Sequence, residues 1–467
     1  MRRAKSGKQT SLSLCMIVKD EAACLGRCLE SVRRHVDEIV IVDTGSTDRT
    51  VEIAAGFGAR IFHHPWENDF SKHRNQSLSY ATGEWIFQLD ADEELFAEDG
   101  RRLRETIQQG EADYYHCRFH DIKKDGSVHG VFNLIRLFRA GMGMRFERKV
   151  HNQLQTQGKE GYSAIRIRHY GYDLAPRQME AKHIRTTTLL REIIDSDPQD
   201  AYSLFQLAAS YSMHREFDKA VTYGERALDI MRRDKLQNGY FLTAYHTVAQ
   251  GYYALGRYAD AERIGLEALD TFPLHLDMAH LLATLYFRTK TLDRCRLLSH
   301  RYLEIHSALT EDPSLVGTMY CHSLLKKHEI LFGLALVHFT DRDIETADRY
   351  FEESLNHAQH PLETAVRICR FYLDRRADEK AMKWLRLVCE AGSTASKEDP
   401  SLTDPGLLAY DVAEMFCRHR HWELAQSALR LALDIAPDGF DRPRFDRLLK
   451  DADPRPETAQ ASRRFLD

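Results

Sequence analysis

A recurrent spacing of small residues most constrains what the C-terminal half of this 467-residue chain can fold into. Alanine or cysteine stands at the eighth and twentieth positions of a unit of about 34 residues. The pairs are Ala208 and Ala220, Ala249 and Ala261, Ala283 and Cys295, Ala335 and Ala347, Cys369 and Ala381, and Ala413 and Ala425. Because small residues let helices approach closely, this pattern predicts a stack of helix pairs in which neighbouring pairs bury one another.

A second series of residues fits the same frame. Three residues after the first small one, the units carry Tyr211, Tyr252, Tyr286, Tyr372 and Phe416, with His338 as the exception. The units start at residues 201, 242, 276, 328, 362 and 406. This pattern resembles the tetratricopeptide repeat, so we expect an all-α solenoid of about six repeats over residues 201–440. A linking helix would occupy residues 176–200, and residues 441–467 would cap the array.

Residues 11–175 follow a different pattern, in which short β-rich runs alternate with helical stretches. Strands are predicted over residues 14–18, 38–42, 59–62 and 85–89, and helices over 24–32 and 47–57. Such alternation is typical of βαβ units with a mostly parallel, Rossmann-like sheet, which binds ligands at the carboxyl ends of its strands. Residues 1–10 are expected to form a disordered basic tail.

Composition excludes several classes of function. The net charge of −5 argues against a general nucleic-acid binder. Nine cysteines without a CxxC pair indicate reduced thiols rather than a zinc or disulfide framework, which favours a cytoplasmic location. The apolar stretch 12–18 is too short for a transmembrane segment.

Acidic residues follow two of the predicted strands. Asp90 and Asp92 come directly after the strand that ends at Leu89, and Asp43 ends another strand. Paired carboxylates suit a divalent cation such as Mn²⁺ or Mg²⁺, which can bridge to a diphosphate. Asp43 could accept a hydrogen bond from a nucleotide base. The structural alternatives are an exposed acidic loop at Asp90 and a capped turn at Asp43.

Four segments in order make a family resemblance recognisable. They are LCMIVKDE at 14–21, IVDTGSTDRT at 41–50, DFSKHRN at 69–75 and TGEWIFQLDADEE at 82–94. Together they resemble glycosyltransferase family two, whose domain has the GT-A fold. Among the enzymes that this chain resembles, bacterial members join this domain to tetratricopeptide-like helices. They include bacterial enzymes that glycosylate peptides or proteins, such as the cysteine-modifying sublancin type.

The resemblance implies a role for four residues in binding the nucleotide of a UDP-sugar donor. Val18 and Glu21 match positions that hold the base and ribose, and Asp43 matches the residue that reads the base. Arg74 matches a basic residue near the phosphates, where a guanidinium offers a fork of donors.

The resemblance also implies a metal site. Asp90 and Asp92 match the family's cation-binding DxD motif, in which Asp90 also lies beside the bound nucleotide. Many GT-A enzymes add a downstream histidine, for which His169 is the candidate. The alternative for His169 is an ordinary polar core or surface residue.

The general base stays open at this point. His151 lies where the look-alikes read His-Glu, but the next residue here is Asn152. If the missing glutamate were the base, Glu147 or Glu94 would have to replace it, and the sequence does not choose between them.

The sequence thus predicts a metal-dependent, inverting glycosyltransferase that moves a sugar from a UDP-sugar to a protein, peptide or glycan acceptor. The repeat array would recruit the acceptor or form a homodimer. The main alternative is a non-catalytic tetratricopeptide scaffold that only binds nucleotide sugar. A sugar nucleotidyltransferase would want a glycine-rich loop that residues 19–23 lack.

Overall fold

The computed structural model describes residues 10–123, 126–171, 176–236, 239–312, 315, 321–375, 377, 379–384, 413–414, 416–417, 422–435 and 447. The described residues up to Leu325 form one compact unit, and those from Lys326 onward form a second. Almost all of the predicted tail (1–10) and capping segment (441–467) lies outside the described residues. No helix in the described ranges combines the length and apolar character needed to cross a membrane.

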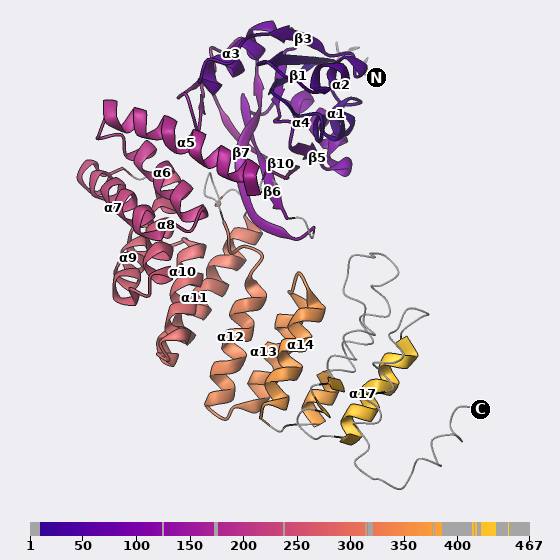
Figure 1. The fold of residues 1–467 in the computed structure, drawn as a ribbon, viewed down its shortest axis with the longest axis vertical. Helices are drawn as coiled ribbons and strands as arrows, with labels where there is room; N and C mark the ends of the chain where they lie inside the picture. Colours follow the sequence, from indigo (N-terminus) through magenta and orange to yellow (C-terminus); the bar gives the residue numbers. More distant parts are fainter. Residues whose placement is uncertain are drawn as a thin grey trace, which may run out of the picture. The chain divides into compact units, whose positions relative to one another are not determined.

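The first unit begins with an eight-stranded mixed sheet (Figure 1). Its strands are β1 Leu12–Val18, β2 Glu38–Asp43, β3 Arg60–His63, β4 Trp85–Gln88, β5 Glu93–Leu95, β6 Tyr114–Ile122, β7 Val128–Arg139 and β10 Glu160–His169. They lie in the order β3-β2-β1-β4-β7-β6-β10-β5. The predicted βα series forms the parallel half, β3-β2-β1-β4. Antiparallel pairs join β7 to β4 and β6, and β5 to β10.

Helices cover both faces of the parallel half. The helices are α1 Leu25–Val32, α2 Thr50–Gly56, α3 Phe70–Tyr80 and α4 Gly100–Gln109. Leu14 and Met16 of β1 share a core with residues of α1 and α4, whereas Cys15 faces the side that Leu78 of α3 covers. Burial on both faces explains why β1 reads as a nearly continuous apolar run. A separate small sheet pairs β8, Arg145–Glu147, with β9, Gln153–Gln155.

The helical region begins with α5, Pro176–Ser196, in the range predicted to link the two parts. The following pairs are α6 Ala201–Met213 with α7 Phe217–Asp234, α8 Gly239–Ala254 with α9 Tyr258–Thr271, and α10 Leu276–Arg288 with α11 Leu292–Glu311. The second unit holds α12 Lys327–Thr340, α13 Ile344–Asn356, α14 Pro361–Leu373 and α17 Trp422–Ile435. Five predicted repeat starts fall within three residues of a helix start, and the sixth, 406, lies outside the described residues.

The repeated residues pack as their spacing predicts. Every small residue of the predicted series is buried, as are the aromatic residues that accompany it. Two of the tyrosines also bond to an acidic residue on the preceding helix: the Tyr252 hydroxyl donates to Glu225 at 2.8 Å and that of Tyr286 to Glu262 at 2.8 Å. Each aromatic residue thus fills the space between two helices and fixes their separation.

Contacts near both ends join the repeats of the first unit to the sheet domain. Arg148, after β8, pairs with Asp200 at the start of α6 at 2.7 Å. After α11 the chain returns to the sheet, where Cys321 forms a β-bridge with Val131 of β7. The first three repeats are therefore pinned to the sheet domain near both of their ends.

Candidate active site

The loops after β1 and β2 are tied to each other at the carboxyl edge of the sheet. The backbone N–H of Thr47 donates to Asp20 at 2.6 Å, and that of Asp20 donates to the Ser46 hydroxyl at 3.0 Å. The carbonyl of Val18 accepts from the N–H of Thr44 at 2.9 Å. The edge predicted to hold the base and ribose is therefore fixed by hydrogen bonds between the two loops.

Asp43 ends β2 and is almost fully buried. Its carboxylate accepts from the N–H of Ser46 at 3.1 Å and that of Gly45 at 3.3 Å, and it contacts His63 Nδ1 at 3.1 Å. Burial acts to raise the pKa of Asp43, but the bonds from Ser46 and His63 outweigh it and lower that pKa. Asp43 therefore organises its own turn as an ionised group, and a carboxylate has further lone pairs for a base N–H.

Two arginines hold Asp90. Arg74 of α3 donates to both carboxylate oxygens, at 2.7 and 3.0 Å, and Arg136 of β7 approaches within 3.2 Å. Arg136 also bonds to the buried Glu93 and to Gln88. Burial opposes the charge on Asp90, but Arg74 and Arg136 outweigh it and lower its pKa, while burial raises the pKa of Glu93.

Arg74 still has unused hydrogen-bonding capacity. Its Nε and Nη1 are buried and have no hydrogen-bond partner. A buried donor without a partner costs roughly 1–3 kcal/mol, and more for a charged group. An anion beside Asp90 would satisfy these donors, and a diphosphate has suitable oxygen acceptors. The surroundings of Arg74 therefore fit the phosphates of a nucleotide.

Strand pairing brings His169 to Asp92. In the β5–β10 ladder His169 lies opposite Glu93, and the N–H of Tyr170 donates to the Asp92 carbonyl at 3.0 Å. This places His169 Nε2 3.6 Å from Asp92 Oδ2. The other ring nitrogen, Nδ1, contacts the buried Asp121 of β6 at 2.6 Å. Burial acts to lower the pKa of His169, but Asp121 and Asp92 outweigh it and raise that pKa to about 8.

The space between His169 and Asp92 suits a cation. A Cβ on Gly171 would collide with His169 Nε2 and lie 2.6 Å from Asp92 Oδ2, so only glycine keeps this space open. Histidine nitrogen and carboxylate oxygen both bind divalent ions, and Asp121 orients the ring as outer partners of metal-binding histidines do. Asp92 and His169 therefore fit a cation well, whereas both oxygens of Asp90 already accept from arginines.

Glu21 lies close to this cluster. Its pKa is raised, first by burial and further by the charges of Asp92 and Asp90, against the effect of a bond from Cys24. The backbone N–H of Glu21 donates to Thr50 at 2.7 Å. The loop after β1 therefore lies near the DxD loop.

The three predicted general bases have different surroundings. Glu94 pairs with Arg27 and Arg168, each at 3.3 Å, and accepts a hydrogen bond from the Tyr170 hydroxyl at 3.2 Å. Glu147 of β8 is half-exposed and pairs with Arg145 at 2.8 Å. His151 is exposed in the next loop.

The segment that carries Glu147 and His151 is fastened to α3. Asn75 exchanges two hydrogen bonds with the backbone of Phe146, at 2.8 and 2.9 Å. The hydroxyl of Ser71 donates to the Arg148 carbonyl at 2.6 Å, and Arg74 lies over the Phe146 ring. The DFSKHRN motif therefore positions the segment 146–151 beside Arg74.

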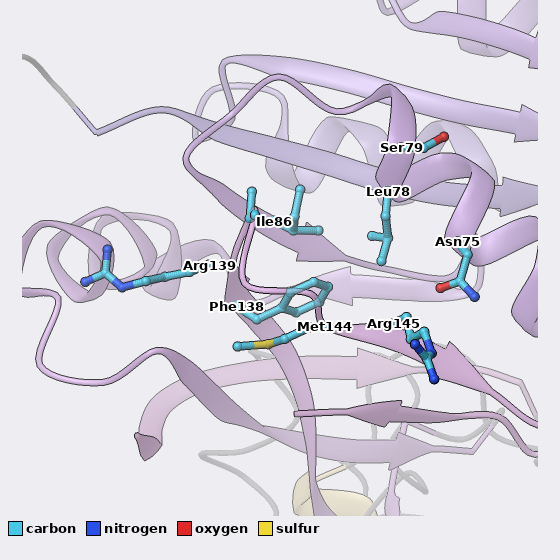
Figure 2. A pocket seen from close by; sticks show the side chains of 10 residues that line it. Asn75, Leu78, Ser79, Ile86, Phe138, Arg139, Met144 and Arg145 are labelled. Atoms are coloured by element: carbon cyan, nitrogen blue, oxygen red, sulfur yellow. The ribbon is translucent and has the colours of Figure 1, made fainter. Parts of the chain in front are cut away.

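A separate pocket of about 340 Å³ opens between α3 and the β7–β8 region (Figure 2). Leu78, Ile86, Phe138 and Met144 form its apolar wall, and Asn75 and Arg145 lie at one side. None of the predicted site residues lines this pocket. It is therefore distinct from the DxD cluster.

Sequence reasoning missed Arg136 and Asp121. Arg136 interrupts an apolar strand, LIRLF at 134–138, and this interruption was the available signal. Asp121 gives no such signal, because its partnership with His169 depends on the β6–β10 pairing.

Comparisons with known proteins match two parts of the chain to families. Residues 13–168 match the family described as glycosyl transferase family 2, and residues 241–272 match the tetratricopeptide repeat. The N-terminal domain is therefore a family 2 glycosyltransferase domain with the GT-A fold. The predicted combination with tetratricopeptide repeats is confirmed.

Individual relatives match part of the chain. The chain is 41% identical over 204 residues to a TPR repeat-containing protein of Synechococcus elongatus, covering 41% of this chain and 50% of that protein. It is 25% identical over 306 residues to the SPbeta prophage-derived glycosyltransferase SunS of Bacillus subtilis, covering 64% and 71%. The chain thus spans about half the length of the first relative. A crystal structure of S. aureus TarS 1-349 in complex with UDP-GlcNAc aligns over 63% of this chain and 92% of that chain, with 15% identity and a TM-score of 0.30.

Proposed function

We propose that this protein transfers a sugar, with inversion, from a UDP-sugar to a protein or peptide acceptor in a reaction that depends on Mn²⁺ or Mg²⁺. The observation that carries the proposal is the arrangement around Asp90. Arg74 offers two unused buried donors on one side, and Asp92 and His169 border an open space on the other. A diphosphate and its cation need these two features side by side.

The residues divide the work as follows. Arg74 binds the diphosphate, Asp43 accepts from the base, and Asp92 and His169 hold the cation. The cation, when bound, supplies Lewis-acid stabilisation of the charge that develops on the leaving diphosphate. Arg136 keeps Asp90 ionised and fixed in place.

We place the general base on the segment 146–151. Glu94 is a weaker candidate, because Arg27, Arg168 and Tyr170 already contact its carboxylate. Glu147 and His151 lie on the segment that α3 holds beside Arg74 and that Arg148 ties to the first repeat. An acceptor delivered by the repeats would therefore meet these two residues at the donor site.

The array is proposed to recruit the acceptor. Its first helix, α6, contacts the segment 146–151, because the Tyr202 hydroxyl donates to the His151 carbonyl at 3.3 Å. Stacked repeats present an extended surface that suits a polypeptide better than a small sugar. Dimerisation through the array is the competing role.

The direct test measures UDP release by the purified full chain from a panel of UDP-sugars, with and without Mn²⁺, Mg²⁺ and candidate peptides. We expect release to require a cation and to rise with the correct peptide. Turnover in excess chelator would contradict the metal role. Tight UDP binding without turnover under any condition would favour the non-catalytic scaffold instead.

A truncated chain tests the recruitment role. A cut directly after α5 would remove Asp200 and the Val131–Cys321 bridge, so the cut belongs after Leu325, where the first compact unit ends. We expect this shorter chain to release UDP from the donor normally and to show a higher KM for the peptide. An unchanged KM, with the full chain behaving as a dimer, would assign the repeats beyond Leu325 to dimerisation rather than to recruitment.

A further inference from the structure

A second group of potential metal ligands lies in the first three repeats, separate from the sheet edge. It consists of His246 on α8, Asp277 on α10 and His322 in the segment after α11. One ligand atom from each residue lies within 4.8 Å of the others. His246 and Asp277 are buried and His322 is half-buried, so the cluster opens to solvent on the side of His322.

The local structure holds Asp277 in place. Its Oδ2 accepts from the N–H of His322 at 2.9 Å, and its Oδ1 accepts from the N–H of Ser323 at 2.7 Å. These bonds fix the carboxylate and bring the backbone of His322 to it. Outer hydrogen bonds of this kind orient carboxylates that bind metals.

The two histidines complete the arrangement from other elements. The rings of His246 and His322 stack with centroids 5.3 Å apart. Beside them, the buried His275 contacts the Leu242 carbonyl through Nε2 at 2.9 Å, while its Nδ1 has no hydrogen-bond partner. Its ring centroid lies 6.5 Å from that of His246. The repeats therefore concentrate imidazole nitrogens around one buried carboxylate.

We propose that His246, Asp277 and His322 bind a transition-metal ion of the Zn²⁺ class, with the remaining position open to water. Two imidazoles and one carboxylate form a ligand set that zinc accepts, and three protein ligands leave one position free. Mg²⁺ prefers an all-oxygen environment, so a ligand set with two imidazoles favours an ion of the Zn²⁺ class over Mg²⁺.

The site would explain an insertion in the array. The repeat starts at 276 and 328 lie further apart than one repeat length, and His322 lies in the extra segment. The same segment carries Cys321, which bridges to Val131 of β7. A metal at His322 would therefore fasten this returning segment to α8 and α10 and hold the repeats against the sheet.

The test titrates the full chain with Co²⁺, a spectroscopic substitute for Zn²⁺, in excess Mg²⁺. The same titration on Asp92→Asn removes any contribution from the sheet-edge site. We expect about one Co²⁺ per chain in both proteins, with visible absorption bands that Zn²⁺ abolishes. Failure of sugar transfer would leave this result unaffected, so the two proposals fail separately.

His322→Ala and His246→Gln test the ligands, and His300→Ala, an exposed histidine on α11, is the matched control. We expect affinity to fall at least about 100-fold in the first two and to be unchanged in the control. Circular dichroism and the Zn²⁺-induced rise in Tm report the fold in parallel. Wild-type affinity in both ligand variants, or no binding by Asp92→Asn, would overturn the site, leaving the three residues as a hydrogen-bonded turn.

Discussion

The sheet edge and the repeat array place their polar groups in opposite ways. At the sheet edge, the buried Glu93 and the partly exposed Asp90 lie against Arg74 and Arg136, which come from distant elements. In the array, apart from the cluster of His246, Asp277 and His322, small and aromatic residues fill most of the interior, and charged groups such as Glu262 pair at its margin. Changes at the edge should therefore alter chemistry more than stability, and changes inside the array should do the reverse.

The largest expected effect is that of Asp92→Asn. The side chain is partly exposed and pairs with no arginine of the described ranges, so unfolding free energy should change by no more than about 0.5 kcal/mol. Loss of a cation ligand should cost several kcal/mol of transition-state stabilisation, hence at least about 100-fold in kcat. Steady-state UDP release and thermal unfolding check both points. Glu52→Gln, on the exposed face of α2, serves as the control.

Asp121→Asn should have the next largest effect. Asp121 is not a ligand of the proposed cation. Its Oδ1 lies 2.6 Å from His169 Nδ1 and orients the His169 ring. Loss of such an outer partner typically weakens metal binding by about 10–100-fold. A titration of Mn²⁺ against UDP-sugar turnover should show a raised cation requirement with kcat largely recovered at saturation. Wild-type cation dependence would contradict the role of His169 as a ligand.

Gly265→Ala tests whether a change inside the repeat array lowers stability more than activity. A Cβ on Gly265 of α9 would lie 2.7 Å from the fully buried Leu282 of α10, so the helices must separate. We expect a loss of about 1–3 kcal/mol in unfolding free energy, with UDP binding unchanged. Gly333→Ala is the matched control, because its Cβ would meet nothing within 4 Å and should be neutral or stabilising. Equal effects in the two variants would mean that helix spacing does not limit stability.

The smallest expected effect concerns Asp43. Asp43→Ala should weaken UDP binding about tenfold, because it removes a base acceptor and the bonds that order Ser46. Asp43→Asn keeps one acceptor oxygen and should lose less. Calorimetry with UDP distinguishes them. Equal affinities for wild type and Asp43→Ala would exclude the base contact.

Features that depend on local pattern could be predicted from the sequence. The strands before Asp43 and Asp90 are apolar runs, so their ends could be located, and the spacing of Ala249 and Ala261 was enough to define a helix pair. The pairing of strands that are distant in the sequence could not be predicted from such local patterns. β5 has only three residues, so its pairing with β10, which brings His169 to Asp92, leaves no pattern in the sequence.

The proposed metal site in the repeats could not be predicted from local patterns either. His246, Asp277 and His322 carry no motif spacing, and the insertion that holds His322 appeared only as an irregular repeat interval. The resemblance to glycosyltransferases made His169 a candidate, because the family pattern links a downstream histidine to the DxD motif. His322 belongs to no such family pattern in the segments that carry the resemblance.

The bridge between Cys321 and Val131 has a consequence for how this protein can change during evolution. Duplicating or deleting one helix pair between α6 and α11 would carry Cys321 away from β7 by the thickness of a repeat. The copy number of the first three repeats is therefore locked by the sheet. Gains and losses of repeats among relatives should therefore be rare within the first compact unit.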